Sequence, residues 1–273
     1  MKRLLITLSL VIATSSSVRA AEIEATPGQQ GHSFQTTLTQ SVDLDYLLHL
    51  PTEYSKSKKQ WPLILFLHGA GERGDDLSKV AVHGPPNLVS RKPRVRKNET
   101  DERKSLRLEA IQMLKEGFII VSPQCAAGDF WHADHLAALL DRIESKHRVD
   151  PKRIYLTGLS MGGYGSWDLG FRHPGRFAAM APICGGANTI VPLLHGKDSV
   201  YGPQQKRLPI WVFHGGKDPV VVPEESQRLV GLMKRLGNTS TKLTIYPNAR
   251  HDSWTETYAN PELYRWFLSH SLP

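Results

Sequence analysis

Cysteine is scarce in this 273-residue chain, which contains only Cys125 and Cys184. A dense disulfide framework is therefore excluded as the basis of its stability. Paired cysteines and His-x-x-x-His spacings, which are typical of zinc sites, are also missing. His132 and His135 are three residues apart, and we interpret this spacing as one face or the first turn of a helix. The sequence predicts no metal ligand set and no cofactor.

Apolar runs long enough to span a membrane are lacking as well. The N-terminus contains a shorter one, which follows Lys2 and Arg3 and leads to a small-x-small cleavage site ending at Ala20. This order is typical of a signal peptide, here residues 1–20. We therefore expect a secreted or periplasmic protein in which residues 21–32 form a flexible leader.

A strong excess of charge of one sign is missing too. The formal net charge is +8, and three of the basic residues lie within the first twenty, so the balance does not indicate nucleic-acid binding. Positive charge is concentrated between Arg91 and Lys104, inside an irregular stretch, residues 75–104, that we expect to cross one rim of the fold. We interpret it as a solvated loop or as a basic rim that attracts an anionic substrate such as an acidic polysaccharide.

The chain does contain apolar runs that alternate with helical periodicity. Continuous apolarity predicts strands that are buried on both faces, as in a parallel sheet. These runs are residues 62–67, 118–121, 154–157, 177–183, 210–213 and 243–246. Helical spacing recurs between them, at residues 108–117, 136–147, 163–171, 229–236 and 261–267. We predict a single α/β domain over residues 33–273, with a mostly parallel sheet of about eight strands covered on both faces.

Two details follow from this arrangement. Residues 34–39 and 44–50 are short strand candidates that we expect to form a hairpin. Cys125 and Cys184 each follow a sheet strand with two other strands between them. At roughly 4.8 Å per strand that separation is too wide for a disulfide, which needs Cα atoms within about 7 Å. We expect two free, mostly buried thiols.

The most informative stretch is Gly158-Leu159-Ser160-Met161-Gly162. It lies between an apolar run and a helical segment, so the serine is expected at the tip of a strand-turn-helix elbow. Such a serine sits on strained backbone with its hydroxyl exposed at the end of a sheet. Glycines two residues before and after it are required because side chains there would collide with neighbouring elements. We therefore predict Ser160 as a nucleophile.

A serine nucleophile needs a histidine as base and a carboxylate that orients the histidine. Asp218 follows the apolar run 210–213, and His251 follows the run 243–246, in the order acid then histidine that accompanies such elbows. Since carboxyl ends of parallel strands share one edge of a sheet, the three side chains are expected to meet there.

The alternative acids are Asp168, Asp198 and Asp252, and the alternative bases His173 and His214. Asp168 falls inside the helix after the serine, Asp198 lies in a loop with no following strand, and Asp252 adjoins His251 and cannot easily turn back to it. His173 sits before a proline at a helix end, and His214 is interpreted as a loop-packing residue.

Two backbone amides are expected to bind the oxyanion of the intermediate. One belongs to Met161, the residue after the nucleophile, and the other to Ala70 in the loop after the run 62–67, with Gly71 as the alternative. Trp131 and Trp254 follow strands at the same edge. They are candidates for stacking against a sugar ring or an aryl acyl group, although packing roles explain them equally well.

The same early loop, Gly69 to Gly74, matches the dinucleotide fingerprint Gly-x-Gly-x-x-Gly. A helix should follow the fingerprint at once, but the chain continues into the adjacent prolines Pro85 and Pro86, which we expect to forbid a helix there. No apolar strand with a final acidic residue comes next. We expect no nucleotide site.

With these residues placed, the chain resembles α/β-hydrolases of the serine esterase type. More narrowly, it resembles exported carboxylesterase-like proteins known as predicted peptidases, which are related to polyhydroxybutyrate-depolymerase-like and feruloyl-type carbohydrate esterases. The stretches that carry the resemblance are residues 61–74, 122–125, 158–163, 181–186, 213–218 and 251–254. The resemblance implies Ser160, Asp218 and His251 as the catalytic triad. The charged segment from Arg91 to Lys104 departs from the pattern.

The expected function is that of a serine hydrolase that cleaves carboxylic ester bonds through an acyl-enzyme, on a small-molecule or polysaccharide ester. A small-peptide serine peptidase of the prolyl-oligopeptidase-like type is the alternative, although no propeller-like second domain is visible. A non-catalytic binding protein on the same fold is a third reading, and it predicts an eroded triad.

Overall fold

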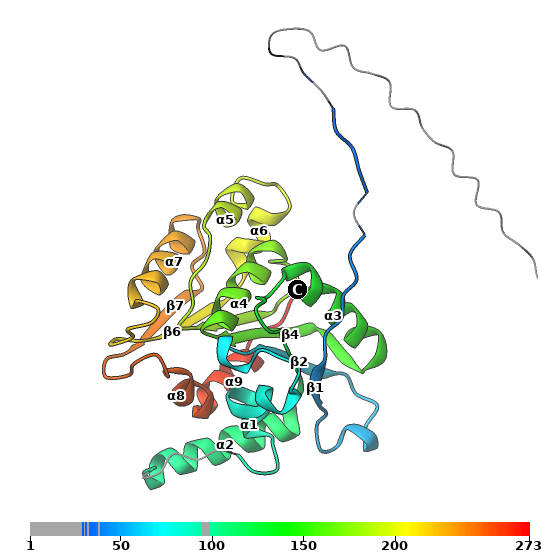
Figure 1. The fold of residues 1–273 in the computed structure, drawn as a ribbon. Coiled ribbons are helices and arrows are strands. Elements are labelled where there is room, and N and C mark those ends of the chain that lie inside the picture. The colour runs from blue at the N-terminus through cyan, green and yellow to red at the C-terminus, as the bar shows by residue number, and fades with distance from the viewer. Residues whose placement is uncertain (1–28, 30, 32, 38, 94–98) are drawn as a thin grey trace, which may run out of the picture. The chain divides into compact units, whose positions relative to one another are not determined.

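Seven strands form one sheet in the computed structural model, which describes residues 29, 31, 33–37, 39–93 and 99–273 (Figure 1). Their order across the sheet is β1-β3-β2-β4-β5-β6-β7. The strands are β1 (Tyr46–His49), β2 (Trp61–Leu67), β3 (Ile119–Pro123), β4 (Val149–Leu159), β5 (Ala179–Ile183), β6 (Ile210–Gly215) and β7 (Thr241–Tyr246). β1 alone runs antiparallel to its neighbour. The predicted α/β class and the mostly parallel sheet are confirmed, with seven strands in place of about eight.

The predicted N-terminal hairpin is wrong. The described residues of the segment 34–39 form no strand, while β1, from the second candidate, pairs with β3, so that Tyr46 lies opposite Pro123. Local alternation marks a segment as extended but does not select its partner, and the open edge of β3 supplied one. The predicted signal peptide and most of the predicted leader lie outside the described residues. Residues 41–273, which contain all seven strands, form a unit separate from residues 1–40.

Helices cover both faces of the sheet (Figure 1). On one face lie α3 (Ala133–Lys146), α4 (Met161–Arg172) and α7 (Pro223–Arg235), and on the other α1 (Gly84–Leu88), α2 (Asp101–Gly117), α8 (Trp254–Ala259) and α9 (Pro261–Leu268). Two shorter helices, α5 (Ile190–His195) and α6 (Tyr201–Arg207), follow β5, and α5 packs against α4.

The sequence of β2 is apolar throughout because both faces of this strand are covered. Leu63, Leu65 and Leu67 join the core under α3, α4 and α7, while Ile64 and Phe66 join the core under α2, α8 and α9. Successive side chains of a strand point to opposite faces, and both faces are covered here. All five side chains are fully buried.

The stretch predicted as an irregular excursion, residues 75–104, is largely helical where it is described. A 3-10 helix spans Leu77–Val82, α1 follows, and α2 begins at Asp101. Pro85 and Pro86 occupy the first turn of α1, where a missing N–H and a fixed φ suit a helix start, so the expectation that they forbid a helix was wrong. Thr100 caps α2 by accepting a hydrogen bond from the Arg103 N–H at 3.3 Å.

Both cysteines are free and buried. The strands that precede them, β3 and β5, are separated by β2 and β4, as the sequence predicted. Burial raises the pKa of Cys125 to about 11 and that of Cys184 to about 12, so both are neutral thiols near pH 7.

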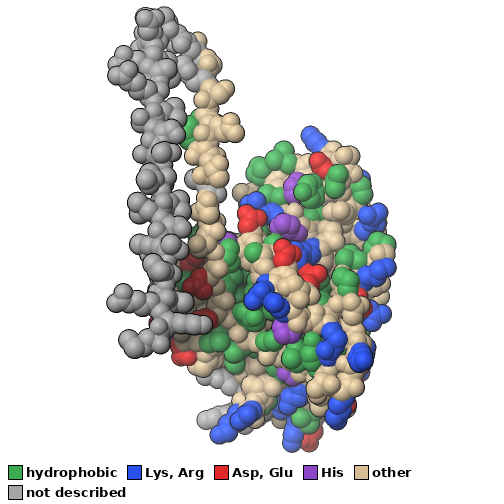
Figure 2. Space-filling model, turned by 90° about the vertical axis from the view of Figure 1, so that its right-hand side faces the viewer, with side chains coloured by type: hydrophobic (Ala, Val, Ile, Leu, Met, Phe, Trp, Pro, Cys, Tyr) green, Lys and Arg blue, Asp and Glu red, His purple; other side chains and the backbone are tan. Residues whose placement is uncertain are grey.

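The surface carries both signs of charge. On the face seen in Figure 2, the described Lys and Arg side chains are interspersed with carboxylates and hydrophobic groups rather than gathered in one patch. Within the described parts of the chain, no helix combines the length and apolarity needed to cross a membrane.

Candidate active site

Ser160 lies at the tip of a strained turn between β4 and α4. Its φ of 53° and ψ of −116° fall in a region that residues with side chains rarely adopt. A hydrogen bond fixes the turn to the neighbouring strand, since the Ser160 N–H donates to the Ile183 carbonyl oxygen of β5 at 3.0 Å. The backbone therefore presents the hydroxyl at the carboxyl end of the sheet, as the sequence predicted for an elbow of this kind.

The glycines around Ser160 are set by close backbone contacts. A Cβ on Gly162 would lie 2.0 Å from the Leu67 carbonyl oxygen of β2, and a Cβ on Gly158 would lie 2.3 Å from the Gly162 oxygen. Atoms do not approach so closely, so β2, β4 and the first turn of α4 can meet only where these positions lack side chains.

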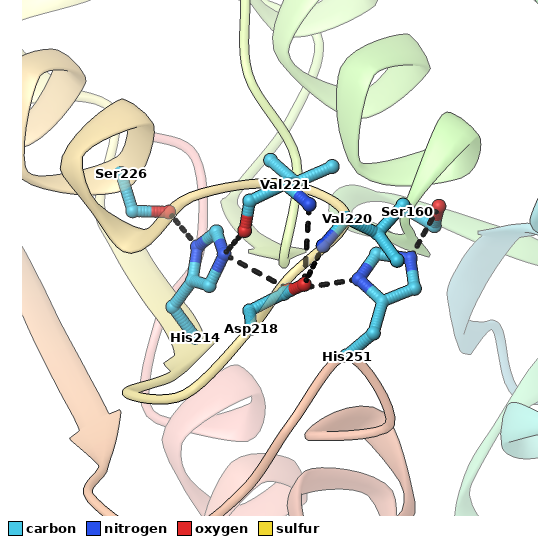
Figure 3. Close-up of polar contacts among 7 residues, drawn as sticks. All are labelled: Ser160, His214, Asp218, Val220, Val221, Ser226 and His251. Carbon is cyan, nitrogen blue, oxygen red and sulfur yellow. Dashed lines mark hydrogen bonds and ion pairs between the residues drawn. The ribbon is translucent and has the colours of Figure 1, made fainter.

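His251 connects Ser160 with Asp218 (Figure 3). Its Nε2 lies 2.9 Å from Ser160 Oγ, and its Nδ1 lies 2.7 Å from Asp218 Oδ2. Asp218 comes from the loop after β6 and His251 from the loop after β7. The parallel order of the sheet thus brings together three side chains that are up to 91 residues apart in the chain.

The Asp218 carboxylate is held by the backbone on its other side. Its Oδ1 accepts hydrogen bonds from the N–H groups of Val220 and Val221 at 2.9 and 3.1 Å. The residue is only 5% exposed. Its other oxygen is thereby directed at His251, and it remains bound by several donors in a site that water barely reaches.

A second histidine contacts the same carboxylate, and the sequence did not reveal this role. His214, at the end of β6, is fully buried, and its Nε2 lies 3.3 Å from Asp218 Oδ2 and 2.8 Å from the Val221 carbonyl oxygen (Figure 3). Because both of these neighbours are acceptors, Nε2 carries the proton. Nδ1 then accepts from the Ser226 hydroxyl at 2.7 Å. The sequence feature that could have indicated this contact is the spacing His-x-x-x-Asp after the apolar run 210–213.

The two amides predicted to bind an oxyanion lie at the starts of helical turns. Met161 is the first residue of α4, so its N–H has no acceptor within the helix. Ala70 is the first residue of a 3-10 turn, Ala70–Glu72, which is separated from the end of β2 by two residues. β2 and β4 are neighbours in the sheet, which places the two loops at the same edge.

His68 holds the loop that contains Ala70. Its Nδ1 lies 2.6 Å from the Gly69 carbonyl oxygen and its Nε2 lies 3.0 Å from the Cys125 nitrogen, so Nδ1 is the donor and Nε2 the acceptor. Burial lowers the pKa of His68 to about 4, which keeps the ring neutral at pH 7. The loop is therefore tied to the chain after β3.

The two tryptophans singled out in the sequence have different surroundings. Trp131 is buried, its Nε1 donates to the His68 carbonyl oxygen at 3.1 Å, and its ring lies edge-on to the His68 ring. It is a packing residue behind the Ala70 loop. Trp254 is half-buried, and its ring lies edge-on to His251 with 5.2 Å between the ring centres.

The rival residues are engaged elsewhere. Asp168 pairs with Arg172 on α4. Asp198 accepts from the N–H groups that begin α6. His173 forms the C-terminal cap of α4. In the part of the chain that the structure describes, none of these three side chains is hydrogen-bonded to Ser160.

Among the residues that the structure describes, one group of three side chains has donor atoms close enough to hold a metal ion. Cys184 Sγ and donor atoms of Asp218 and His251 lie within 4.8 Å of one another. Metal binding there would require a thiolate, whereas burial keeps Cys184 protonated, and Asp218 and His251 are already bonded to each other. The donor set therefore does not fit a resident metal ion as it stands.

Comparisons with known proteins agree with this architecture. Residues 187–258 match the serine aminopeptidase S33 family, a span that contains Asp218 and His251 but not Ser160. A bifunctional acetylxylan esterase/xylanase of Neocallimastix patriciarum is 28% identical over 167 residues, covering 55% of this chain and 22% of that protein. Poly(3-hydroxyalkanoate) depolymerase C of Paucimonas lemoignei is 29% identical over 114 residues, covering 34% and 27%. The chain thus spans about a quarter of the length of these curated relatives.

Among solved structures, the crystal structure of a thermostable esterase superposes with a TM-score of 0.63 and 30% identity, covering 84% of this chain and 59% of that one. The seven-stranded sheet, its helical layers and this likeness agree on the fold. The chain has the α/β-hydrolase fold.

Proposed function

We propose that this protein is a serine hydrolase of carboxylic esters that acts through Ser160, His251 and Asp218. The observation that carries the proposal is the continuous hydrogen-bonded path from Ser160 Oγ through the imidazole of His251 to Asp218. Serine hydroxyl, imidazole and carboxylate in this sequence form the arrangement that activates a serine at neutral pH. The esterases among its relatives support an ester as the substrate.

The mechanism follows from where the protons lie on the imidazole of His251. His251 Nδ1–H donates to Asp218, which leaves Nε2 free to accept the proton of Ser160 as its oxygen attacks the ester carbonyl. The resulting oxyanion is stabilised by the N–H groups of Met161 and Ala70. His251 then gives its proton to the departing alcohol, and an acyl-enzyme remains. Water, activated by the same imidazole, releases the acid and restores Ser160.

The proposal has a direct test. Hydrolysis of 4-nitrophenyl acetate and butyrate by the wild type should fall by about 10⁴-fold or more in the Ser160→Ala variant, because Ser160 supplies the hydroxyl that is hydrogen-bonded to His251 Nε2. Equal turnover by the two proteins would instead support the reading of a non-catalytic binding protein. Circular dichroism of the variant provides the control for folding.

A small-peptide serine peptidase is the second candidate. The match of residues 187–258 to the serine aminopeptidase family favours it. The same triad can cleave an amide when the leaving amine is protonated by His251. Aminoacyl 4-nitroanilides, assayed beside the 4-nitrophenyl esters with the same enzyme, decide between the two, and we expect the esters to be preferred.

We also propose export to the periplasm or the medium, because Lys2, Arg3 and the following apolar run form a signal-peptide pattern that ends at Ala20. N-terminal sequencing of protein recovered after expression with the complete chain tests this proposal, and the expected first residue is Ala21.

A further inference from the structure

The loop from His68 to Gly74 matches a nucleotide fingerprint in the sequence, and its charged residues have no role in the chemistry described so far. It connects β2 with the 3-10 helix Leu77–Val82. Ala70, whose N–H is proposed to bind the oxyanion, is exposed on this loop. An oxyanion-binding amide stabilises the intermediate only if its direction is set before the reaction. The loop must therefore fix the peptide groups on both sides of Ala70.

The peptide group before Ala70 is held on its inner side. Its oxygen belongs to Gly69 and accepts a hydrogen bond from His68 Nδ1 at 2.6 Å. The carbonyl and the N–H of a trans peptide point in opposite directions, and the described residues include no cis peptide bond. Because the oxygen is bound to a buried ring, the Ala70 N–H is directed away from that ring. The Cys125 N–H donates to Nε2 of the same imidazole at 3.0 Å, so the segment after β3 holds the ring in place.

The peptide group after Ala70 is held by Arg73. Its Nε donates to the Ala70 carbonyl oxygen at 3.0 Å, and its Nη1 donates to the Asp129 carbonyl oxygen at 3.0 Å. One planar guanidinium thus bridges the Ala70 loop and the loop after β3. We propose that Arg73 is a positioning residue of the reaction, which together with His68 sets the direction of the oxyanion-binding amide of Ala70. The inference rests on the proposed ester hydrolysis.

The segment after β3 is a suitable anchor, because further hydrogen bonds join it to the same loop. The Gly74 N–H donates to the Cys125 carbonyl oxygen at 3.0 Å, and Gln124 Nε2 donates to the Glu72 carbonyl oxygen at 2.9 Å. Both bonds lie beyond Ala70 in the chain and do not involve its own peptide groups. The guanidinium of Arg73 is what extends this anchorage to Ala70.

The charge of Arg73 acts in the same direction as its hydrogen bonds. Among the residues that the structure describes, Arg73 bonds to two carbonyl oxygens and forms no ion pair with a carboxylate. Burial is the main cause of the lowered pKa of His68, and the charge of Arg73 adds to it, which keeps Nε2 unprotonated and able to accept from Cys125. A cation beside this loop also favours the negative charge that develops on the substrate oxygen.

Two substitutions of Arg73 separate the fork from the charge. Lysine keeps the charge but has a single nitrogen in place of the planar fork, and methionine removes both. We expect kcat/KM for 4-nitrophenyl acetate to fall about tenfold or more in Arg73→Met, and by a smaller factor in Arg73→Lys. The inhibition constant of an alkyl trifluoromethyl ketone should rise by the same factor in each variant. Its adduct with Ser160 places a negatively charged oxygen against the same amides, so a role in folding alone would not produce this proportionality.

Arg172→Met is the matched control. Arg172 lies on the surface of α4, where it pairs with Asp168, and its loss should leave both kcat/KM and the inhibition constant unchanged. Thermal denaturation of each variant measures folding, and Arg73→Lys decides the question if Arg73→Met does not fold. Wild-type kcat/KM in the Arg73 variants overturns the proposal. So does a fall in kcat/KM without a matching rise in the inhibition constant of the ketone.

The two proposals fail separately. If Ser160→Ala hydrolyses 4-nitrophenyl acetate as fast as the wild type, the ester-hydrolase proposal falls, and the role of Arg73 falls with it. If Ser160→Ala is inactive while both Arg73 variants keep the wild-type kcat/KM and inhibition constant, ester hydrolysis stands and only the positioning role of Arg73 is wrong.

Discussion

The carboxylate of Asp218 has two histidine neighbours, and only His251 faces Ser160. The other, His214, donates to Asp218 and to the Val221 carbonyl oxygen from a fully buried position. The loop from β6 to Asp218 is therefore folded around this ring. At the scale of single residues, the geometry of the triad depends on His214, whose hydrogen bonds go to Ser226, Val221 and Asp218 rather than to Ser160 or His251.

His214→Leu should weaken both stability and catalysis. It leaves the Val221 oxygen and the Ser226 hydroxyl without their ring partner, which costs about 1–3 kcal/mol in a buried site, and each 1.4 kcal/mol lost at the transition state is about tenfold in rate. We expect kcat/KM for 4-nitrophenyl acetate to fall about tenfold or more. Urea denaturation of the same variant measures the loss of stability.

Ser226→Ala is the comparison, because it removes one hydrogen bond of the ring and leaves the contact with Asp218 in place. It should cost stability with little effect on kcat/KM. Full activity of His214→Leu, with reduced stability alone, would contradict a positioning role for His214.

At the scale of elements, the site depends on how closely β2, β4 and α4 approach. The Gly162 backbone lies against the Leu67 carbonyl, and Gly163 lies against Gly185 after β5. The start of α4 is thus wedged between the ends of three strands. That contact fixes both the strained φ of Ser160 and the position of the Met161 amide.

Gly162→Ala should therefore be severely destabilising. Its Cβ would lie 2.0 Å from a backbone oxygen, and the neighbouring elements must separate to admit it. We expect the free energy of unfolding to fall by about 3 kcal/mol, the upper end for overpacked sites, and the activity to be lost. Thermal denaturation and the ester assay measure the two effects.

The same substitution at Gly117 gives the contrast. This glycine is the last residue of α2, and a Cβ there meets nothing within 4 Å. Gly117→Ala should be neutral or stabilising by up to about 1 kcal/mol, since alanine favours the helix. Equal destabilisation by both substitutions would show that close packing is not what distinguishes Gly162.

At the scale of the whole molecule, the burial of several histidines makes the free energy of unfolding depend on pH. Burial is the largest cause of the lowered pKa at His49, His68, His147, His173 and His270. Below the ordinary histidine pKa of about 6.5 the unfolded chain takes up protons that the folded protein does not. Stability is therefore fully present above that pH and is lost as the pH falls from there toward the folded-state pKa values.

His68 makes this quantitative, because it is 1% exposed and its folded-state pKa is about 4. Between about pH 6 and pH 4.5 it should contribute up to about 1.4 kcal/mol per pH unit to the loss of stability. Urea denaturation at several pH values should show a shallower dependence for His68→Gln, by nearly one proton, although that variant is less stable at pH 7. An identical slope in both proteins would mean that His68 is protonated in the folded state.

Much of the fold was predictable because its signals are local. Six of the seven strands were expected from apolar runs, since burial on both faces leaves no room for polar alternation. The errors came from segments whose structure depends on distant partners. β1 pairs with β3 and not with its neighbour in the chain, and Pro85 and Pro86 begin α1 because the missing N–H is harmless in a first turn.

The sequence by itself determined where most strands end and which residues follow each of them, because glycine spacing and apolar runs are properties of contiguous residues. It therefore predicted Ser160, Asp218 and His251 at one edge of the sheet. Only the tertiary structure decided that His214 shares Asp218, that Trp131 packs behind the Ala70 loop, and that the ring of Trp254 contacts both His251 and His83. These are contacts between segments that lie far apart in the chain. Which segments meet depends on how the helices pack on the sheet, and a local sequence pattern does not contain that information.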